Sequence, residues 1–313
     1  HLSARQYALE LLAIAGATDD EATETPGAMG TQITLGLAYW TLGQFSESVE
    51  SWTEAHRLAV GLGAAREEAI AAFCLMVGYL PLDLPEAARW SETARTAAAR
   101  SDDWARGFSL GFAGAVSATG GDLAGATALF TEALGIQQRI GDYEGAGISQ
   151  GGLALIAGLS GDLERSLGLY EQSLAAYETI GDRAEEARIL GEMAWIYLNQ
   201  GNIATARTRF LDAVVAYQDL ASVRGIGLAL IGLASVDVAD EHFMRALEIS
   251  AAAELFIGEE GIVNAYLEAP DGREYLDRAK AALKPDEIER ALARGSRLSV
   301  IDTVRFARTI LPD

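Results

Sequence analysis

Residues 141–220 read GDYEGAGISQGGLALIAGLSGDLERSLGLYEQSLAAYETIGDRAEEARILGEMAWIYLNQGNIATARTRFLDAVVAYQDL, and the two halves of this stretch are near-copies of one unit. Gly141-Asp142 recurs as Gly181-Asp182, and Gly161-Asp162-Leu163 recurs as Gly201-Asn202-Ile203, so the unit is 40 residues long. Self-similarity at this period is typical of stacked helical hairpins, each of which buries its apolar face against its neighbours. The stretch therefore predicts an all-α chain with a role in recognition, and it leaves the partner open.

The turn of this unit recurs on both sides of the quoted stretch. An apolar residue follows each turn, and these apolar positions are Phe45, Leu84, Leu123, Leu163, Ile203 and Phe243. They are spaced 39, 39, 40, 40 and 40 residues apart, a register too regular to arise by chance. Six hairpins are therefore expected within residues 29–255, over 29–66, 67–105, 106–142, 143–182, 183–222 and 223–255.

The segments outside the array differ from it in composition. Residues 2–16 have the spacing of an amphipathic helix, and residues 17–28 are acidic and contain Pro and Gly, which predicts a loop. Residues 256–313 are more charged, and we expect them to form helices that cap the last hairpin. Within them, Ser299 and Asp302 fit the first turn of a helix.

Composition and charge exclude several classes of protein. Lys and Arg number 24 against 45 Asp and Glu, and a net charge of −21 repels phosphate backbones, so we expect no direct binding to nucleic acid. No apolar run reaches the about 18 residues of a membrane span, and no signal peptide is recognisable. The single cysteine, Cys74, fits a reducing compartment, so we expect a cytoplasmic protein. Because the chain starts at His1 without Met, we expect it to be a piece of something longer.

No group of residues in the sequence predicts catalysis, a metal site or a cofactor. The histidines His1, His56 and His242 lie far apart, and only the last has carboxylates beside it. Cys74 lies between apolar residues on a predicted helix, as expected of a small buried side chain rather than a nucleophile. We therefore expect a non-enzymatic chain without cofactors.

Small and aromatic residues recur at fixed places within each unit. Three residues after the apolar position stands Ser48, Ala87, Ala126, Ser166, Ala206 or Ala246, and four further on stands Trp52, Phe130, Tyr170 or Phe210. With Leu35-Gly36 and Tyr39 on the preceding helix, this order resembles the tetratricopeptide repeat (TPR), although the unit is longer than the usual length of about 34 residues. The resemblance implies a right-handed superhelical solenoid of antiparallel helix hairpins with a C-terminal helical cap.

The longer unit is similar to the repeats in the C-terminal sensor regions of large bacterial signalling ATPases, among them LuxR-type transcriptional regulators of the maltose-activator kind and ATPase-linked nucleotide cyclases. Residues Ala252-Ala253-Glu254-Leu255 and Gly295-Ser296-Arg297-Leu298-Ser299 resemble the closing segment of those regulators. The resemblance implies an interaction or sensor module for signal transduction within a larger bacterial regulatory protein. The rest of that parent polypeptide would be one of its partners, and whether its output is transcription or a cyclic nucleotide stays open.

The same resemblance implies that the first helix of each hairpin lines a concave groove. None of the eighteen groove positions, three in each hairpin, is charged, which argues against a clamp for a peptide carboxylate. Aromatic and Met side chains stand at both ends of this groove, and Gly and Ala stand in its middle. Together with flanking residues, the expected groove residues are Ile33, Leu37, Trp40, Met76, Tyr79, Phe108, Phe112, Leu155, Arg188, Glu192, Trp195 and Asn199.

Because a long exposed apolar channel is a liability, the sequence is consistent with burial of these residues by tight superhelical curvature or with one of three occupants of the groove. A peptide, a partner protein or a small apolar ligand would make the chain a binding module. The chain's own C-terminal helices within 256–313 would make it a structural scaffold, and a second copy would make it a homodimer. Arg188 and Glu192, four residues apart on one helix, either orient a ligand through hydrogen bonds or form a simple surface pair.

Overall fold

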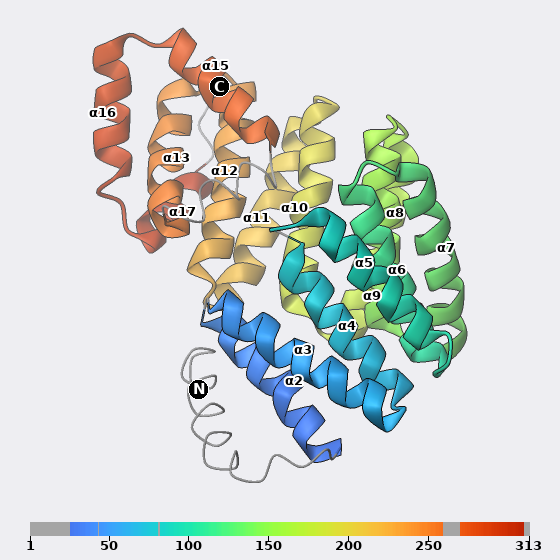
Figure 1. The fold of residues 1–313 in the computed structure, drawn as a ribbon. Helices are drawn as coiled ribbons and strands as arrows, with labels where there is room; N and C mark the ends of the chain where they lie inside the picture. The colour runs from blue at the N-terminus through green and yellow to red at the C-terminus, as the bar shows by residue number, and fades with distance from the viewer. Residues whose placement is uncertain (1–25, 43, 81, 259–269, 310–313) are drawn as a thin grey trace. The chain divides into compact units, whose positions relative to one another are not determined.

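The computed structural model describes residues 26–42, 44–80, 82–258 and 270–309 (Figure 1). All regular structure in these ranges is α-helical, and successive helices form hairpins, which confirms the predicted architecture. The chain divides into an N-terminal unit, residues 1–160, and a C-terminal unit, residues 161–313. Among the helices in these ranges, none is both long and apolar enough to cross a membrane.

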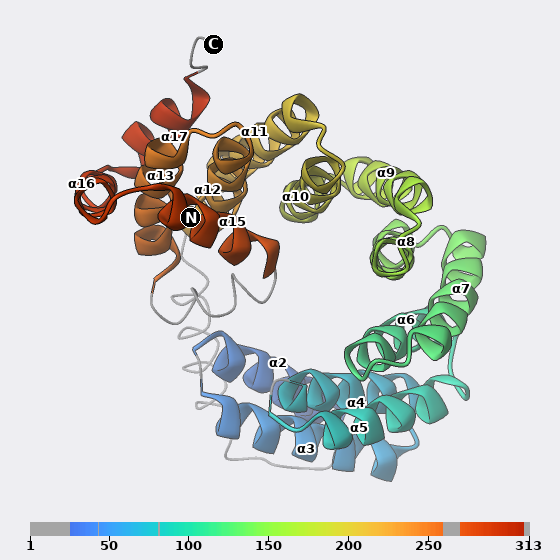
Figure 2. The same cartoon turned by 90° about the horizontal axis from the view of Figure 1, so that it is seen from above.

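The first six described helices of the N-terminal unit form three consecutive pairs, and the seventh packs against the sixth. Its helices are α2 (Pro26–Thr41), α3 (Phe45–Leu62), α4 (Ala65–Tyr79), α5 (Leu84–Ala98), α6 (Asp103–Thr119), α7 (Leu123–Ile140) and α8 (Tyr143–Leu159). Each second helix packs against the first helix of the next pair, and among the first helices α4 contacts α6 and α6 contacts α8 (Figure 2). The first helices of these hairpins therefore form one layer and the second helices another, as in stacked helical repeats.

The N-terminal end of the array begins earlier than the sequence predicts. Helix α2 starts at Pro26, inside the segment 17–28 that was expected to be a loop. Proline is compatible with the first turn of a helix because the N–H group that it lacks has no partner within the helix at that position. The predicted helix at 2–16 and the remainder of the predicted loop lie outside the described residues.

The C-terminal unit contains further repeat helices and, among its described residues, three helices that follow the last hairpin. Its helices are α9 (Leu163–Ile180), α10 (Arg183–Asn199), α11 (Ile203–Asp219), α12 (Val223–Ala239), α13 (Phe243–Ile257), α15 (Pro270–Ala282), α16 (Pro285–Gly295) and α17 (Val300–Arg308). Helix α15 packs against α12 and α13, α16 packs against α13, and α17 packs against both α12 and α13 (Figure 2). The predicted cap is therefore formed by helices that cover the last hairpin, and Ser299 accepts a hydrogen bond from Asp302 N at the start of α17 as expected.

The turns explain the recurring Gly-Asp pairs. At the start of α8, the side chain of Asp142 accepts a hydrogen bond from Gly145 N at 3.0 Å, and the preceding Gly141 has a φ of 72°. The Asp side chain satisfies an N–H group of the first turn, and glycine adopts a positive φ at little cost. In the sixth copy, His242 makes no side-chain cap and Glu241 has a φ of 62°. This turn therefore has the geometry of the others without the residues that favour it.

Aromatic rings of the second helices pack on glycines of the first helices. A Cβ on Gly232 would lie 2.2 Å from Cε1 of Phe210, and a Cβ on Gly152 would lie 2.3 Å from Cζ of Phe130. Only glycine leaves room for these rings, and burying each of them stabilises the fold by about 2–3 kcal/mol. Glu192 stands midway between these glycines in the 40-residue register. The fifth hairpin thus carries a carboxylate where its neighbours have no side chain.

Candidate functional site

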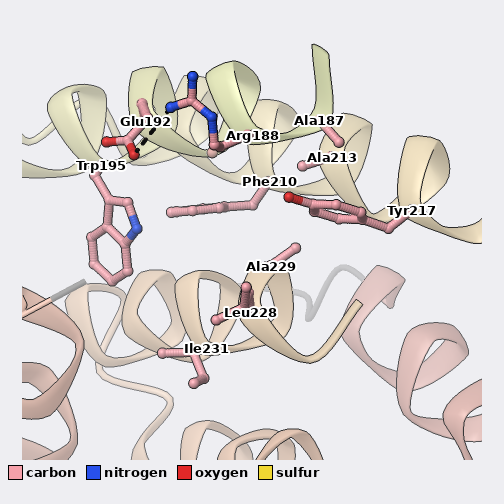
Figure 3. Close-up of a pocket in the computed structure, with 11 residues that line it drawn as sticks. Ala187, Arg188, Glu192, Trp195, Phe210, Ala213, Tyr217, Leu228, Ala229 and Ile231 are labelled. Carbon is pink, nitrogen blue, oxygen red and sulfur yellow. Dashed lines mark ion pairs between the residues drawn. The ribbon is translucent and has the colours of Figure 1, made fainter. Parts of the chain in front are cut away.

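A cavity of about 70 Å³ lies in the C-terminal unit between α10, α11 and α12 (Figure 3). Three aromatic residues form much of its wall, and small or aliphatic residues form most of the remainder. The lining residues are Ala187, Arg188, Gly191, Glu192, Trp195, Phe210, Ala213, Tyr217, Leu228, Ala229 and Ile231. We call this cavity the α10–α12 pocket. Its apolar walls suit an apolar group, and its volume is below that of pockets for drug-sized ligands, so it has room for one side chain or a small apolar group.

The aromatic wall of the α10–α12 pocket is held in place by packing. The rings of Trp195 and Phe210 meet edge to face with centroids 5.2 Å apart, and Phe210 is fixed against Gly232. Tyr217 lies at the opposite end of the pocket from Trp195 (Figure 3), and a Cβ on Gly225 would come within 2.2 Å of its ring. Because these rings have little freedom to move, the pocket exists before any ligand binds.

Two oppositely charged residues stand at the edge of this apolar pocket. The Nε atom of Arg188 donates a hydrogen bond to Glu185 at 2.8 Å, and its Nη1 atom lies 3.9 Å from Oε1 of Glu192. The side chains of Arg188 and Glu192 are 43% and 35% exposed, so the pair itself stabilises the fold little, by at most about 1 kcal/mol. Both groups are accessible to a ligand at the pocket edge.

The charge of Arg188 is secured by its surroundings. Desolvation, the largest effect on this group, lowers the pKa of Arg188, but Glu185 and Glu192 together raise that pKa above its ordinary value. The guanidinium therefore stays protonated and acts as a donor only. Glu192 supplies an acceptor beside it, so the pocket edge offers both kinds of hydrogen-bonding group.

The 40-residue register sets this pair apart from the rest of the array. The position of Arg188 is occupied by Ile148 in the preceding hairpin and Leu228 in the following one, and the position of Glu192 by glycine in both. In the third hairpin the same two positions are Phe108 and Phe112. The fifth hairpin alone therefore carries charges at both positions.

The predicted groove residues of the C-terminal unit divide between the pocket and the surface. Arg188, Glu192 and Trp195 are brought together at the α10–α12 pocket. Asn199 is exposed at the C-terminal end of α10 and does not line this cavity. Sequence reasoning missed Tyr217 as a lining residue, although it recurs in register with Tyr177.

The predicted groove residues of the N-terminal unit form a separate aromatic group. Phe108 and Phe112 on α6 pack with Phe73 on α4, with ring centroids 4.4–4.8 Å apart. The ring centroids of Trp40 and Phe45 lie 4.9 Å apart. Tyr79, the last residue of α4, is half-buried. These rings mainly stabilise contacts between neighbouring helices.

The remaining predicted residues of this unit differ widely in exposure. Leu37 and Leu155 are 51% and 47% exposed, and Ile33 is half-buried. Met76 is only 2% exposed and packs in the core beside Ala87. The side chain of Met76 therefore faces other helices of the unit and does not reach a surface groove.

Few titratable residues line the pocket. Its titratable residues are Arg188, Glu192 and Tyr217, and no serine, cysteine or histidine lines it. Elsewhere, burial raises the pKa of Cys74 to about 12, so this thiol is not a nucleophile at neutral pH. Within the described ranges, no cluster of His, Cys, Asp and Glu has the geometry to hold a metal ion. The arrangement suits binding of an apolar group with polar contacts at its edge.

Comparison with known proteins identifies the repeats. Residues 145–219 match the model of the tetratricopeptide repeat family, which covers α10 and α11 of the pocket. The chain therefore contains a TPR-like repeat region, and its fold is a TPR-like helical solenoid. No curated protein matches the chain in sequence.

Solved structures with similar folds are distant in sequence. BtubC (BKLC) from P. vanneervenii is 17% identical with a TM-score of 0.54, over 77% of this chain and 89% of that one. Aspartyl phosphate phosphatase F from Bacillus subtilis is 12% identical with a TM-score of 0.60, over 87% and 71%. The Rap conjugation gene regulator of plasmid pLS20, in complex with the Phr* peptide, is 15% identical with a TM-score of 0.57, over 86% and 76%. Identities this low establish a shared fold alone.

Proposed function

We propose that this chain is a protein-interaction module that holds one apolar side chain of a peptide segment in the α10–α12 pocket. The observation that carries the proposal is a preformed aromatic pocket with Arg188 and Glu192 at its edge. TPR-like repeats commonly act as interaction scaffolds rather than catalysts, and the pLS20 regulator is a protein of this fold in complex with a peptide.

The physical chemistry of the pocket defines the class of ligand. Burying one aliphatic or aromatic side chain between Trp195 and Tyr217 would contribute about 1.5–3 kcal/mol. Arg188 would donate to a carbonyl or carboxylate beside that anchor, and Glu192 would accept from an N–H group. Such an anchor with two flanking polar contacts corresponds to roughly millimolar binding, so contacts elsewhere on the peptide would have to supply any tighter affinity.

The test is to pan a library of short random peptides against the full chain and to measure the affinity of enriched peptides by calorimetry. The variant Trp195→Ala should weaken binding about 10-fold or more, because buried aromatic anchors dominate such interfaces. Ile301→Ala, which truncates a 67% exposed residue on α17, is the matched control and should bind as the wild type does. The proposal fails if no peptide is enriched, or if enriched peptides bind Trp195→Ala with unchanged affinity.

A scaffold role is the second candidate, and one observation favours it. On the first helix of the sixth hairpin, Ile231, Ser235 and Val238 are at most 2% exposed, and α15 packs on this helix. This supports self-occupancy of the inner face there. If the scaffold role is the whole function, a chain lacking residues 259–313 should aggregate and bind apolar dyes, and no peptide should bind the intact chain.

We further propose that the chain is the sensor region of a larger bacterial regulator, of the LuxR type or linked to an ATPase and cyclase, which acts in the cytoplasm. The closing segment around Gly295-Ser296-Arg297-Leu298-Ser299 supports this. The test is to sequence the complete reading frame. A nucleotide-binding P-loop upstream, with a DNA-binding or cyclase segment, supports this parentage, and its absence removes it.

A further inference from the structure

Helix α15 of the cap reaches the wall of the α10–α12 pocket. Its buried side consists of Gly272, Leu276 and Ala279, which are four and three residues apart and therefore share one face of the helix. Leu276 and Ala279 are 3% and 0% exposed within the core of the C-terminal unit. They anchor the helix, and this anchoring brings its first two turns to Trp195.

The contacts of α15 with Trp195 are close and involve two residues. A Cβ on Gly272 would lie 3.5 Å from Cη2 of Trp195 and 3.0 Å from Cγ2 of Ile231, so glycine lets the helix approach both pocket residues. The ring of Tyr275 lies 6.5 Å from that of Trp195, and Arg278 covers Tyr275 at 5.2 Å from its centroid. The tyrosine ring is thus itself held in place.

The indole of Trp195 is therefore held from two sides. On the pocket side its ring meets Phe210 edge to face at 5.2 Å, and on the cap side it meets Gly272 and Tyr275. Figure 3 shows the indole extending from α10 at one end of the pocket. Phe210 is 1% exposed and therefore fixed, so the contacts that can be changed without disturbing the core lie on the α15 side of the indole.

We infer that Gly272 and Tyr275 are positioning residues for the α10–α12 pocket, because they fix the indole of Trp195 and thereby set the width of the pocket. Neither residue lines the cavity itself. The cap then does more than cover the last hairpin: it selects the size of side chain that the pocket accepts. This second statement rests on the proposed binding function, whereas the positioning of Trp195 does not.

The first test follows Trp195 without any ligand. The full chain labelled with 5-fluorotryptophan contains five tryptophans, and the ¹⁹F resonance that disappears in Trp195→Phe is that of Trp195. Tyr275→Ala and Gly272→Ala should each shift this resonance and leave those of Trp40, Trp52, Trp90 and Trp104 in place. Lys280→Ala, on the exposed side of α15, is the matched control and should shift none. An unmoved Trp195 resonance in both variants overturns the inference.

Folding is checked in the same samples by hydrogen exchange over residues 270–282. Gly272→Ala replaces a helical glycine by a better helix former, so α15 should keep its protection. If the added methyl group nevertheless detaches α15, Tyr275→Ala alone tests whether α15 positions Trp195. This variant removes one half-buried ring and leaves Leu276 and Ala279 in place.

The second test measures ligand selection with a library-derived peptide made in two versions, one with Phe and one with Trp as the anchor. Tyr275→Ala should favour the Trp version several-fold relative to the wild type, because Trp195 gains room to move outward. Gly272→Ala should favour the Phe version. Unchanged preference with a shifted resonance overturns the selection role. If no peptide binds any variant, the proposed function fails, and the resonance shifts still decide whether α15 positions Trp195.

Discussion

The guanidinium of Arg245 on α13 donates a hydrogen bond of 2.8 Å to the main-chain oxygen of Ala307, 62 residues later at the end of α17. The same Nη2 atom donates at 3.0 Å to the oxygen of Phe306, which also accepts from Thr309 N, so this side chain connects α13 to the last turn of α17. Behind it, the fully buried Asp237 lies 3.3 Å from Nε of Arg245 and 2.9 Å from Nη1 of Arg207.

We predict that Arg245→Met destabilises the C-terminal unit by about 3 kcal/mol, because it leaves Asp237 with a single cationic partner in the core. The carbonyl oxygen of Ala307 also loses this donor, whereas that of Phe306 keeps its hydrogen bond from Thr309 N. Urea unfolding gives the free energy, and hydrogen exchange over residues 300–309 shows whether α17 detaches first. Arg290→Ala is the control, because its 3.0 Å pair with Asp286 on α16 is exposed at both side chains and should contribute less than about 1 kcal/mol. Equal losses in the two variants would contradict this account.

His56 should make the stability of the N-terminal unit depend on pH. Burial, the larger effect, lowers the pKa of His56, and the nearby Glu68 raises it less. Its Nε2 atom is buried without a hydrogen-bond partner in the described structure, and its ring packs edge to face on Trp90 at 5.1 Å. Between the lowered folded pKa and the unfolded value of about 6.5, the unfolded chain binds the proton and the folded chain does not. Stability should therefore fall as pH drops below about 6.5.

The measurement is urea unfolding between pH 7.5 and 5.5, a range above that in which paired carboxylates become protonated. His56→Phe keeps an aromatic ring against Trp90 and cannot take up a proton, so its stability should change less over this range. A wild type as insensitive to pH as the variant would show that His56 protonates without cost in the folded state.

Gly232→Ala should be strongly destabilising. The added Cβ would lie 2.2 Å from Cε1 of the buried Phe210, and overpacking of this kind costs about 1–3 kcal/mol. Gly168→Ala is the control, because its Cβ would meet nothing within 4 Å on α9 and a helical alanine is favoured by about 0.5–1 kcal/mol. Thermal unfolding should move in opposite directions for the two variants, and a loss of stability in both would contradict the packing argument.

Much of this architecture is predictable from sequence because the same Gly-Asp turn recurs between successive helices. The Gly-Asp turns locate the helix boundaries through positive φ and side-chain caps, which depend only on neighbouring residues. The 40-residue register then predicts that Arg188, Glu192 and Trp195 share one face of one helix, and the structure brings these three to the α10–α12 pocket.

The burial of Met76 and the position of Tyr217 depend on contacts between helices, and the 40-residue register does not predict these contacts. Met76 is in the expected register of the first helices, yet Ala87 and Val116 pack beside it and bury it. Tyr217 stands on a second helix, the layer that the repeat rule assigns away from the groove, and reaches the pocket because Gly225 leaves space for its ring. Small residues on a facing helix determine how closely neighbouring hairpins approach each other. The sequence does not show which residues face each other, so this distance has to be taken from the structure.

Substitutions of Gly191 distinguish an effect on peptide binding from an effect on folding. It stands within α10 and lines the α10–α12 pocket, and a Cβ there would meet nothing within 4 Å. Gly191→Ala should therefore stabilise the chain by about 0.5–1 kcal/mol, and Gly191→Leu should fill the cavity without unfolding it. Library-derived peptides should bind the Leu variant at least about 10-fold more weakly by calorimetry, which corresponds to about 1.4 kcal/mol. Because stability rises or holds while affinity falls, misfolding cannot explain such a result. Unchanged affinity in a stable Gly191→Leu chain would place the peptide elsewhere on the molecule.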